Sequence, residues 1–395
     1  MEEPMTDLDA FRAEARAWLD ANCPSELRGP IRDEADIVGG GKRWVPAFAA
    51  QRDWLDAMAA RGWTVPEWPT EYGGGGLTRP QVKILREEMA RIAARKPIVS
   101  SMGISMLGPA LLKYGTEAQK REHLPPIARG DIAWAQGYSE PNAGSDLASL
   151  MTRCEDMGDH YQVTGQKIWT SGADKADWIF VLVRTDRNAP KHLGISFVLV
   201  DMAQKGVEVR PIKLISGRSP FCETFFDAAR SEKHNLVGEL NTGWTIAKYL
   251  LTHEREMIGE VFGAMQGRPL GEMAVDLIGV DTGGRLADSF LRADIARAEI
   301  DAMSFMATLE RVTDQAKAGQ GVGAESSTLK YYGTEMNKRR NELLMDCGGS
   351  DALEWDAEGD AARHWLRSKG NSIEGGTSEV QLNIIAKRVL GLPST

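Results

Sequence analysis

Apolar side chains recur every three or four positions along the first third of the chain, which is the spacing of an amphipathic helix. Residues 7–21 (DLDAFRAEARAWLDA) and 48–62 (FAAQRDWLDAMAARG) are examples, with Ala, Arg and Glu as good helix formers between the apolar positions. Clusters rich in Pro and Gly separate such segments. The pattern therefore predicts a helical domain over residues 1–133.

The pattern changes in the middle third, where short runs rich in Val, Ile and Phe are bounded by Gly, Pro and Asp, as is typical of strands. These runs cover residues 178–186, 194–201, 206–215 and 222–227. Helical periodicity returns from residue 241. We therefore expect an α+β protein, with a central β-domain over residues 134–235 and a C-terminal helical bundle over residues 236–395.

Strands confined to the middle third argue against a doubly wound nucleotide-binding fold, in which helices and strands alternate throughout. The glycine run Gly73–Gly76 is a second candidate for nucleotide binding, since Gly-rich loops can bind phosphates. It follows a Pro-rich turn rather than a strand, and Leu77, Thr78 and Arg79 come after it in place of Lys-Ser/Thr. A tight turn between helices is therefore favoured over a phosphate loop.

Composition narrows the function classes. Hydrophobic residues make up 42% and charged residues 26%, and the 47 Lys+Arg against 56 Asp+Glu give a net charge of -9, which repels nucleic acid and anionic membranes. The cysteines and histidines lack disulfide-framework or metal-ligand spacing, so we expect no metal. The N-terminus has no apolar signal core, and no apolar run approaches the ~20 residues that cross a bilayer. We expect a soluble, cytoplasmic protein without membrane insertion.

Helical phase singles out one carboxylate in residues 244–266. Glu254 completes the apolar stripe of this segment, whereas Glu256 and Glu260 fall on the opposite face. An unpaired buried carboxylate is costly. Glu254 is therefore either paired with a cation, such as the neighbouring Arg255, or it lines a cavity in which it exchanges a proton. Phase alone leaves both interpretations open.

The segment Ile373–Gln381 (IEGGTSEVQ) predicts a helix start after a flexible loop. Two glycines free the backbone, and Ser378 with Gln381 fits a capping box. The N–H groups at such a helix end can hold a pyrophosphate or a developing oxyanion. A simple capped helix after a turn explains the same spacing.

Two segments at the entry to the β-region carry hydrogen-bonding groups. The loop Tyr138–Asp146 (YSEPNAGSD) offers the hydroxyls of Ser139 and Ser145 and glycine backbone to a polar heterocycle. Residues 165–178 place an aromatic plate, Trp169, beside hydroxyl donors. Both segments are equally compatible with ordinary hairpin turns.

Four blocks, in this order, resemble the acyl-CoA dehydrogenase family of flavoproteins: VPEWPTEYGGGGLTRPQ, GPALLKYGTEAQKREHLPPIARGDIAWAQGYSEPNAGSDLAS, GQKIWTSGADKADWIFVLVRTD and IEGGTSEVQLNIIAKRVLGLP. The resemblance covers nearly the whole chain. It implies an N-terminal helical domain, a central β-barrel-like domain and a C-terminal four-helix bundle, with FAD between the last two, in a homotetramer or dimer. It further implies α,β-dehydrogenation of an acyl-CoA thioester, as in the β-oxidation of fatty acids. A carboxylate removes the α-proton, hydride passes to flavin N5, and an electron-transferring flavoprotein accepts the electrons.

The resemblance also implies roles for individual residues. FAD contacts are implied for Tyr138, Ser139, Gly144, Ser145, Trp169, Thr170, Ser171, Thr377 and Glu379. Many members carry the base immediately before Gly-Thr in the last motif, where this chain has Gly375, with Glu374 one residue earlier. A subset that includes the isovaleryl- and long-chain acyl-CoA dehydrogenases takes its base from the inner-bundle helix, at a Glu followed by Arg, here Glu254 and Arg255. Helical phase and resemblance thus agree on Glu254, with Arg255 in support and the Gly375 N–H on the thioester oxygen.

Two departures from the family pattern keep alternatives open. The Arg-x-x-Phe-Gly segment that lends FAD contacts to a neighbouring subunit has no match before Arg285, so Arg285 or Arg292 is expected to substitute. The Gly-Gly block at residues 343–355 lacks the family's Gln. A non-catalytic subunit of a hetero-oligomer therefore remains an alternative to a dehydrogenase. An acyl-CoA oxidase is another alternative, because it shares all of these motifs. The small Gly375 beside a base on the inner helix predicts room for a branched or bulky acyl group.

Overall fold

The computed structural model describes residues 7–31, 34–98, 101–250, 268–317, 323–324, 326–355 and 361–393. The chain forms two compact units, of which the first comprises residues 1–211 and 220–250, and the second residues 212–219 and 251–395. No helix in the described ranges is both long enough and apolar enough to cross a membrane.

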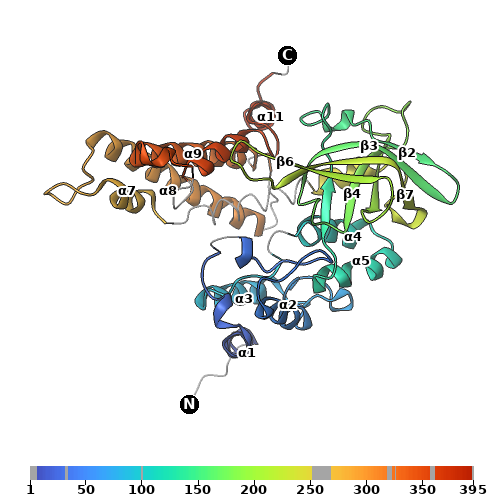
Figure 1. Ribbon diagram of the computed structural model, residues 1–395, viewed down its shortest axis with the longest axis horizontal. Helices are drawn as coiled ribbons and strands as arrows, with labels where there is room; N and C mark the ends of the chain where they lie inside the picture. Colours follow the sequence, from blue (N-terminus) through green and yellow to red (C-terminus); the bar gives the residue numbers. More distant parts are fainter. Residues whose placement is uncertain are drawn as a thin grey trace. The chain divides into compact units, whose positions relative to one another are not determined.

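The first unit combines helices and a mixed sheet (Figure 1). Its helices are α1 (Asp7–Asn22), α2 (Ala49–Ala60), α3 (Arg79–Arg91), α4 (Gly108–Tyr114) and α5 (Glu117–Arg129). Its strands are β1 (Trp134–Gly137), β2 (Arg153–Asp156), β3 (His160–Ser171), β4 (Trp178–Arg184), β5 (Ile195–Asp201), β6 (Val207–Ile212), β7 (Phe221–Glu232) and β8 (Leu236–Val237). Strands β4, β5 and β6 lie within three of the apolar runs and β7 contains the fourth, so the predicted change from helix to strand is confirmed.

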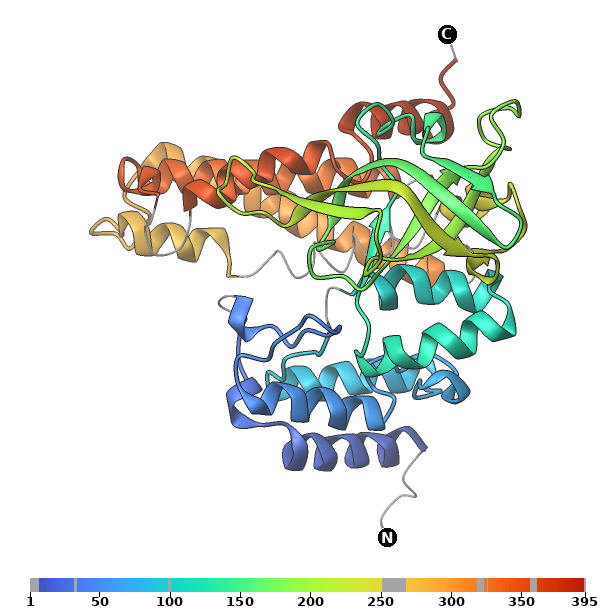
Figure 2. The same cartoon turned by 45° about the vertical axis from the view of Figure 1, so that its right-hand side comes forward.

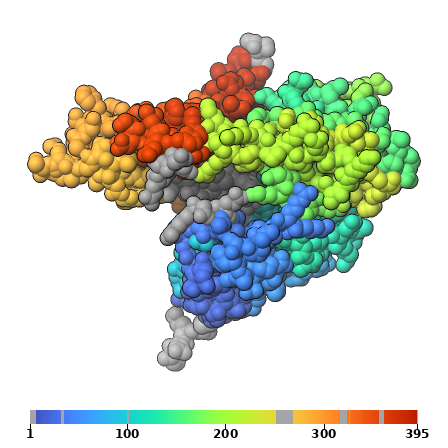
Figure 3. Space-filling model, viewed as in Figure 1, coloured from blue at the N-terminus to red at the C-terminus, as the bar shows by residue number. Residues whose placement is uncertain are grey.

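The sheet has the strand order β6-β7-β3-β2-β4-β5-β8, and β1 pairs in parallel with β4. Strand β4 is buried on both faces, because Phe180 and Leu182 belong to the core that includes α4 and α5, whereas Val181 and Val183 pack in the core that includes β3 and β7. Helices α4 and α5 lie beside the sheet in both views (Figures 1 and 2). The yellow-green surface of β6 and β7 is visible in Figure 3, in agreement with the half-exposed residues along β6. Burial on both faces explains why β4 is a continuous apolar run rather than an alternating one.

The glycine run Gly73–Gly76 forms a turn between a short 3-10 turn (Thr70–Tyr72) and α3, which confirms the structural interpretation. Gly73 and Gly76 have φ angles of +87° and +60°. A Cβ on Gly74 would lie 2.1 Å from the carbonyl oxygen of Trp68. The glycines are therefore needed for close packing against Trp68 and for the left-handed backbone conformation. The run is not part of a phosphate-binding strand–loop–helix unit.

The described helices of the second unit are α7 (Leu270–Ile278), α8 (Ser289–Lys317), α9 (Ser326–Gly348), α10 (Ala361–Ser368) and α11 (Ser378–Ile384), followed by a π-helical turn (Ile385–Val389). Helix α9 packs against α7, α8, α10 and α11. In both views α8 and α9 run side by side (Figures 1 and 2). Helix α9 is therefore the platform on which the C-terminal segments are placed.

A buried carboxylate ties α1 to α3 in the first unit. Only 2% of the Glu88 side chain is exposed, and its oxygens accept hydrogen bonds from Arg16 Nε at 2.9 Å, Arg12 Nη1 at 3.1 Å and Arg91 Nε at 2.8 Å. The hydrogen bond from Arg16 is the main cause that lowers the pKa of Glu88 to about 2, with Arg91 and Arg12 contributing. The carboxylate is thus ionised in the folded chain at any ordinary pH.

Replacing Glu88 with Gln is expected to lower the free energy of unfolding by roughly 2–3 kcal/mol at pH 7, because charge-assisted hydrogen bonds are lost inside the helix pair. The folded-state pKa lies below the ordinary value, so this stabilisation is present above about pH 4.5 and is lost as the pH falls towards 2. Urea unfolding at pH 7 and pH 3 measures both effects. Glu87→Gln is the matched control, since the neighbouring Glu87 is 42% exposed and bonds only Arg12 among the same arginines. Equal unfolding midpoints for the two variants at pH 7 would contradict the assignment.

Candidate functional site

Trp169 lies at an irregularity in β3, where the register with β7 shifts between Ile168 and Thr170. Its φ is +61°, a left-handed conformation that costs free energy for an aromatic residue. The side chain is 51% exposed and contacts Phe221 edge-on, with ring centroids 6.0 Å apart. An exposed, strained Trp is a poor choice for stability alone, so the geometry indicates an aromatic surface held ready for a ligand.

The segment after β1 lies directly beside this strand. The Ser139 carbonyl accepts a hydrogen bond from Ile168 N at 2.9 Å, one residue before Trp169. The Ser139 hydroxyl is half-buried and makes no hydrogen bond within the described ranges, and Gly144 and Ser145 farther along the loop are exposed. In contrast, the ring of Tyr138 is buried and packs edge-on against Phe180. Two of the predicted FAD-binding segments are therefore brought together by the sheet.

The two hydroxyls after Trp169 differ in their surroundings. Thr170 is buried, and its hydroxyl donates to the Cys222 carbonyl at 2.9 Å and lies 2.8 Å from the Thr224 hydroxyl. The Ser171 hydroxyl is half-buried and has no partner among the residues that the structure describes. The side chain of Thr170 thus serves the sheet, and Ser171 is the hydroxyl that remains for a ligand.

The C-terminal motif forms the loop before α11. Thr377 is the N-cap, and its hydroxyl accepts from Val380 N at 3.2 Å. The predicted cap at Ser378 is therefore wrong by one residue. Gly375 and Gly376 have φ angles of +62° and +91°, so the chain needs glycine at both positions to turn into the helix. The wrong cap arose because Thr377 and Ser378 are both good capping residues, and the glycines alone do not fix the start.

Helix α9 is joined to this loop by hydrogen bonds. Lys330 Nζ donates to the Asn371 carbonyl at 3.0 Å, Asn337 Nδ2 donates to Asn371 Oδ1 at 2.7 Å, and Ser378 donates to Glu335 Oε1 at 3.3 Å. Burial lowers the pKa of Lys330, although Glu374 and other nearby carboxylates oppose this shift. Lys330 was not among the residues predicted from the sequence. The feature of the sequence that could have identified it is a lysine on a helix face whose other residues are buried.

The two carboxylates of the motif have separate surroundings. Glu374 accepts from Arg367 Nη2 at 2.7 Å and from Asn371 Nδ2 at 2.5 Å, so both of its oxygens are engaged. Glu379 lies exposed in the first turn of α11. Its own backbone N–H and the Thr377 hydroxyl hold the pKa of Glu379 below its ordinary value. The Glu374 side chain is therefore committed to Arg367 and Asn371 within the motif.

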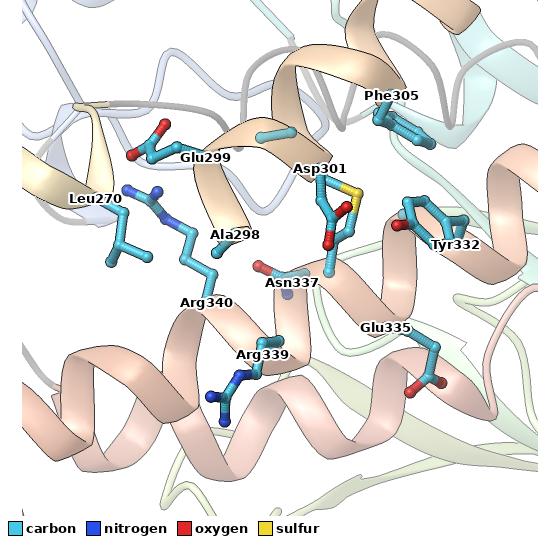
Figure 4. A pocket seen from close by; sticks show the side chains of 13 residues that line it. Leu270, Ala298, Glu299, Asp301, Phe305, Tyr332, Glu335, Asn337, Arg339 and Arg340 are labelled. Atoms are coloured by element: carbon cyan, nitrogen blue, oxygen red, sulfur yellow. The ribbon is translucent and has the colours of Figure 1, made fainter. Parts of the chain in front are cut away.

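The second unit also contains a cavity of about 240 Å³ between α7, α8 and α9 (Figure 4). Apolar side chains such as Leu270 and Phe305 and charged ones such as Glu299 and Arg340 line it. Burial lowers the pKa of Arg340, and Glu299 opposes this effect. Among the residues that the structure describes, no predicted site residue lines this cavity.

Two groups of predicted residues stand apart from this geometry. Glu254 and Arg255 lie outside the described residues. Arg285 is exposed in the turn after α7, and its Nε lies 3.4 Å from Asp281 Oδ2. Asp281 also accepts from the backbone N–H groups of Gly283 and Arg285, which closes the turn. The family's Arg-x-x-Phe-Gly segment would fall before Arg285, where this chain has the turn instead.

Comparison with known proteins gives one consistent result. Family models described as the N-terminal, middle and C-terminal domains of acyl-CoA dehydrogenase match residues 6–131, 135–229 and 241–390. The acyl-CoA dehydrogenase IpdE1 of Mycobacterium tuberculosis is 37% identical over 98% of this chain and 99% of that protein. A solved structure, the Tcur3481-Tcur3483 steroid ACAD, is 32% identical with a TM-score of 0.78 over 100% of both chains. The ChsE4-ChsE5 complex from Mycobacterium tuberculosis is 30% identical with a TM-score of 0.73 over 100% of both chains.

Proposed function

We propose that Glu254 is the catalytic base of this chain, which belongs to the acyl-CoA dehydrogenase family. The reaction is the dehydrogenation of an acyl-CoA thioester between Cα and Cβ. The chain is an oxidoreductase with the α+β fold of that family. The observation that carries the site proposal is the strained, exposed Trp169 beside Ser139. An ordinary hairpin needs neither feature.

The residues present fit FAD, the cofactor of the family. A flavin ring needs an apolar surface against one side and hydrogen-bond partners at its polar edge. Trp169 offers the first, and the hydroxyls of Ser139 and Ser171, which have no partner within the described ranges, offer the second. We assign Thr377 and Glu379, at the start of α11, to the part of FAD beyond the ring.

The chemistry divides between the cofactor and the chain. When bound, FAD supplies the acceptor for the β-hydrogen, which leaves the substrate as hydride. Glu254 takes the α-proton onto a carboxylate oxygen. The Gly375 N–H donates to the thioester oxygen and so makes the α-proton more acidic. Trp169 covers one side of the site and excludes water there.

We further propose that the active form is an oligomer. The Arg-x-x-Phe-Gly segment, which lends FAD contacts to a neighbouring subunit in the family, is missing from this chain, and the exposed Arg285 is the proposed substitute for it. A homotetramer or dimer is the arrangement implied by the sequence, and the likeness to the ChsE4-ChsE5 complex supports a heteromeric alternative. An electron-transferring flavoprotein is the proposed acceptor. The four cysteines are buried thiols in the structure, in keeping with a reducing cytoplasm.

The proposed substrate is a bulky, cyclic acyl-CoA. Gly375 puts no side chain into the loop that meets the thioester, and a steroid ACAD is among the structures that the chain resembles. Turnover of butyryl-, isovaleryl-, palmitoyl- and steroid-side-chain CoA thioesters tests this directly. We expect the highest kcat/KM with the steroid thioester, with reduction of an electron acceptor and little peroxide. A preference for butyryl-CoA would contradict the substrate proposal, and peroxide formation at the rate of turnover would identify an oxidase.

A further inference from the structure

A fully buried lysine lies under the two segments assigned to the flavin edge. None of the Lys167 side chain is exposed. Its Nζ donates to the Tyr138 carbonyl at 3.1 Å and to Glu140 Oε1 at 2.8 Å. Tyr138 and Glu140 are the residues on either side of Ser139, so one ammonium group bonds the backbone before this serine and the side chain after it.

Glu140 extends the contact to the far end of the loop. Its oxygens accept from Met151 N at 2.6 Å and from Thr152 N at 2.9 Å. Burial raises the pKa of Glu140, but the charge of Lys167 and these hydrogen bonds outweigh burial and hold it below its ordinary value. Burial also lowers the pKa of Lys167 to about 8, against the effect of Glu140. Two charges that are buried to this extent are stable only as a pair, because an unpaired buried charge is costly. The distance and orientation of the two groups are therefore tightly constrained.

The same lysine is close to Trp169 along the strand. Lys167 precedes Trp169 by two residues, and the intervening Ile168 donates its N–H to the Ser139 carbonyl. Lys167 therefore connects the loop that carries Ser139 with the strained backbone that carries Trp169. A neutral polar residue could hold such a loop at a lower cost in desolvation free energy, so the buried ion pair requires an explanation beyond stability.

We propose that Lys167, paired with Glu140, is a positioning residue that fixes Ser139 relative to Trp169 and so sets the binding and the electronic environment of the flavin. This inference rests on the proposed FAD site. It adds to that proposal, because it names Lys167 and Glu140 as the pair of side chains that fixes the geometry of the site.

Lys167→Met and Glu140→Gln test the proposal, with Arg184→Met as the matched control. Arg184 is likewise a buried cation that holds this loop, but it donates to the carbonyls of Ala148 and Leu150. We expect both test variants to raise the FAD dissociation constant roughly tenfold and to change the visible spectrum and reduction potential of the bound flavin. The control is expected to lower thermal stability and leave the spectrum and potential of the flavin unchanged.

Amide hydrogen exchange on the FAD-free chain gives a second readout. In Lys167→Met, exchange at Ile168 and at Thr152 should rise together, since one pair protects both. Wild-type FAD affinity and spectrum in Lys167→Met, or an equal spectral change in Arg184→Met, would overturn the proposal. If wild-type protein binds no FAD but the two amides still respond together, the proposed function fails and the structural coupling stands. Should Lys167→Met not fold, Glu140→Gln decides by the same measurements.

Discussion

Replacing Glu254 with Gln is expected to slow the anaerobic bleaching of the bound flavin by an acyl-CoA thioester about 10³-fold. Gln keeps the size of the side chain but cannot accept a proton from Cα, and a positioned base contributes roughly 10²–10⁴ to such a rate. The prediction rests on two independent arguments, since Glu254 completes an apolar stripe and stands before Arg255 where part of the family carries its base. Substrate binding should change little, which a KM close to that of wild type would show.

Two further variants separate Glu254 from its rivals. Glu256→Gln is the matched control, because helical phase predicts Glu256 on the face opposite Glu254, and this variant should bleach at the wild-type rate. Glu374→Gln tests the loop carboxylate, which Arg367 and Asn371 engage. We expect at most a small decrease for this variant. Equal bleaching by wild type and Glu254→Gln would remove Glu254 as the base, and loss of bleaching in Glu374→Gln alone would transfer the role to the loop.

Replacing Gly375 with Val is expected to lower kcat/KM about 10²-fold. The φ of +62° is unfavourable for a β-branched residue, so the backbone must shift and carry its N–H away from the thioester oxygen. Loss of a single oxyanion donor costs roughly 10²–10³ in rate. The measurement is kcat/KM with the best thioester, together with thermal unfolding.

Gly158→Val controls for the strain itself. Gly158 also has a positive φ, +92°, and a Cβ there meets no atom within 4 Å. This variant should lose stability and keep its activity. If both variants lose stability to the same extent and neither loses activity, Gly375 is a turn residue and plays no part in polarising the thioester.

The fold could be predicted largely because its pattern of burial is local. Strand β4 is buried on both faces, so its run of apolar residues was unambiguous, and the glycine run was recognised as a turn from what precedes and follows it. The start of α11 was predicted one residue late, since capping depends on hydrogen-bond geometry that Thr377 and Ser378 satisfy equally well in sequence.

The supporting residues of the site could not be found in this way. Lys167 and Glu140 are 27 positions apart, and nothing in their spacing shows that a sheet register brings them within 2.8 Å. Charged residues are usually assigned to the surface, and their burial follows only from tertiary pairing. Trp169 was singled out from its neighbours, but its positive φ arises from the irregular pairing of β3 with β7. The roles of Glu254 and Gly375 remain predictions.

The most direct test of the central claim is the visible spectrum of the purified wild-type protein before and after anaerobic addition of an acyl-CoA thioester. We predict a yellow protein whose flavin absorbance falls within the mixing time of the first productive thioester, while the corresponding enoyl-CoA accumulates in equal amount. A protein that is colourless and cannot be reconstituted with FAD, or one whose flavin keeps its absorbance with every thioester in the panel, would contradict the account.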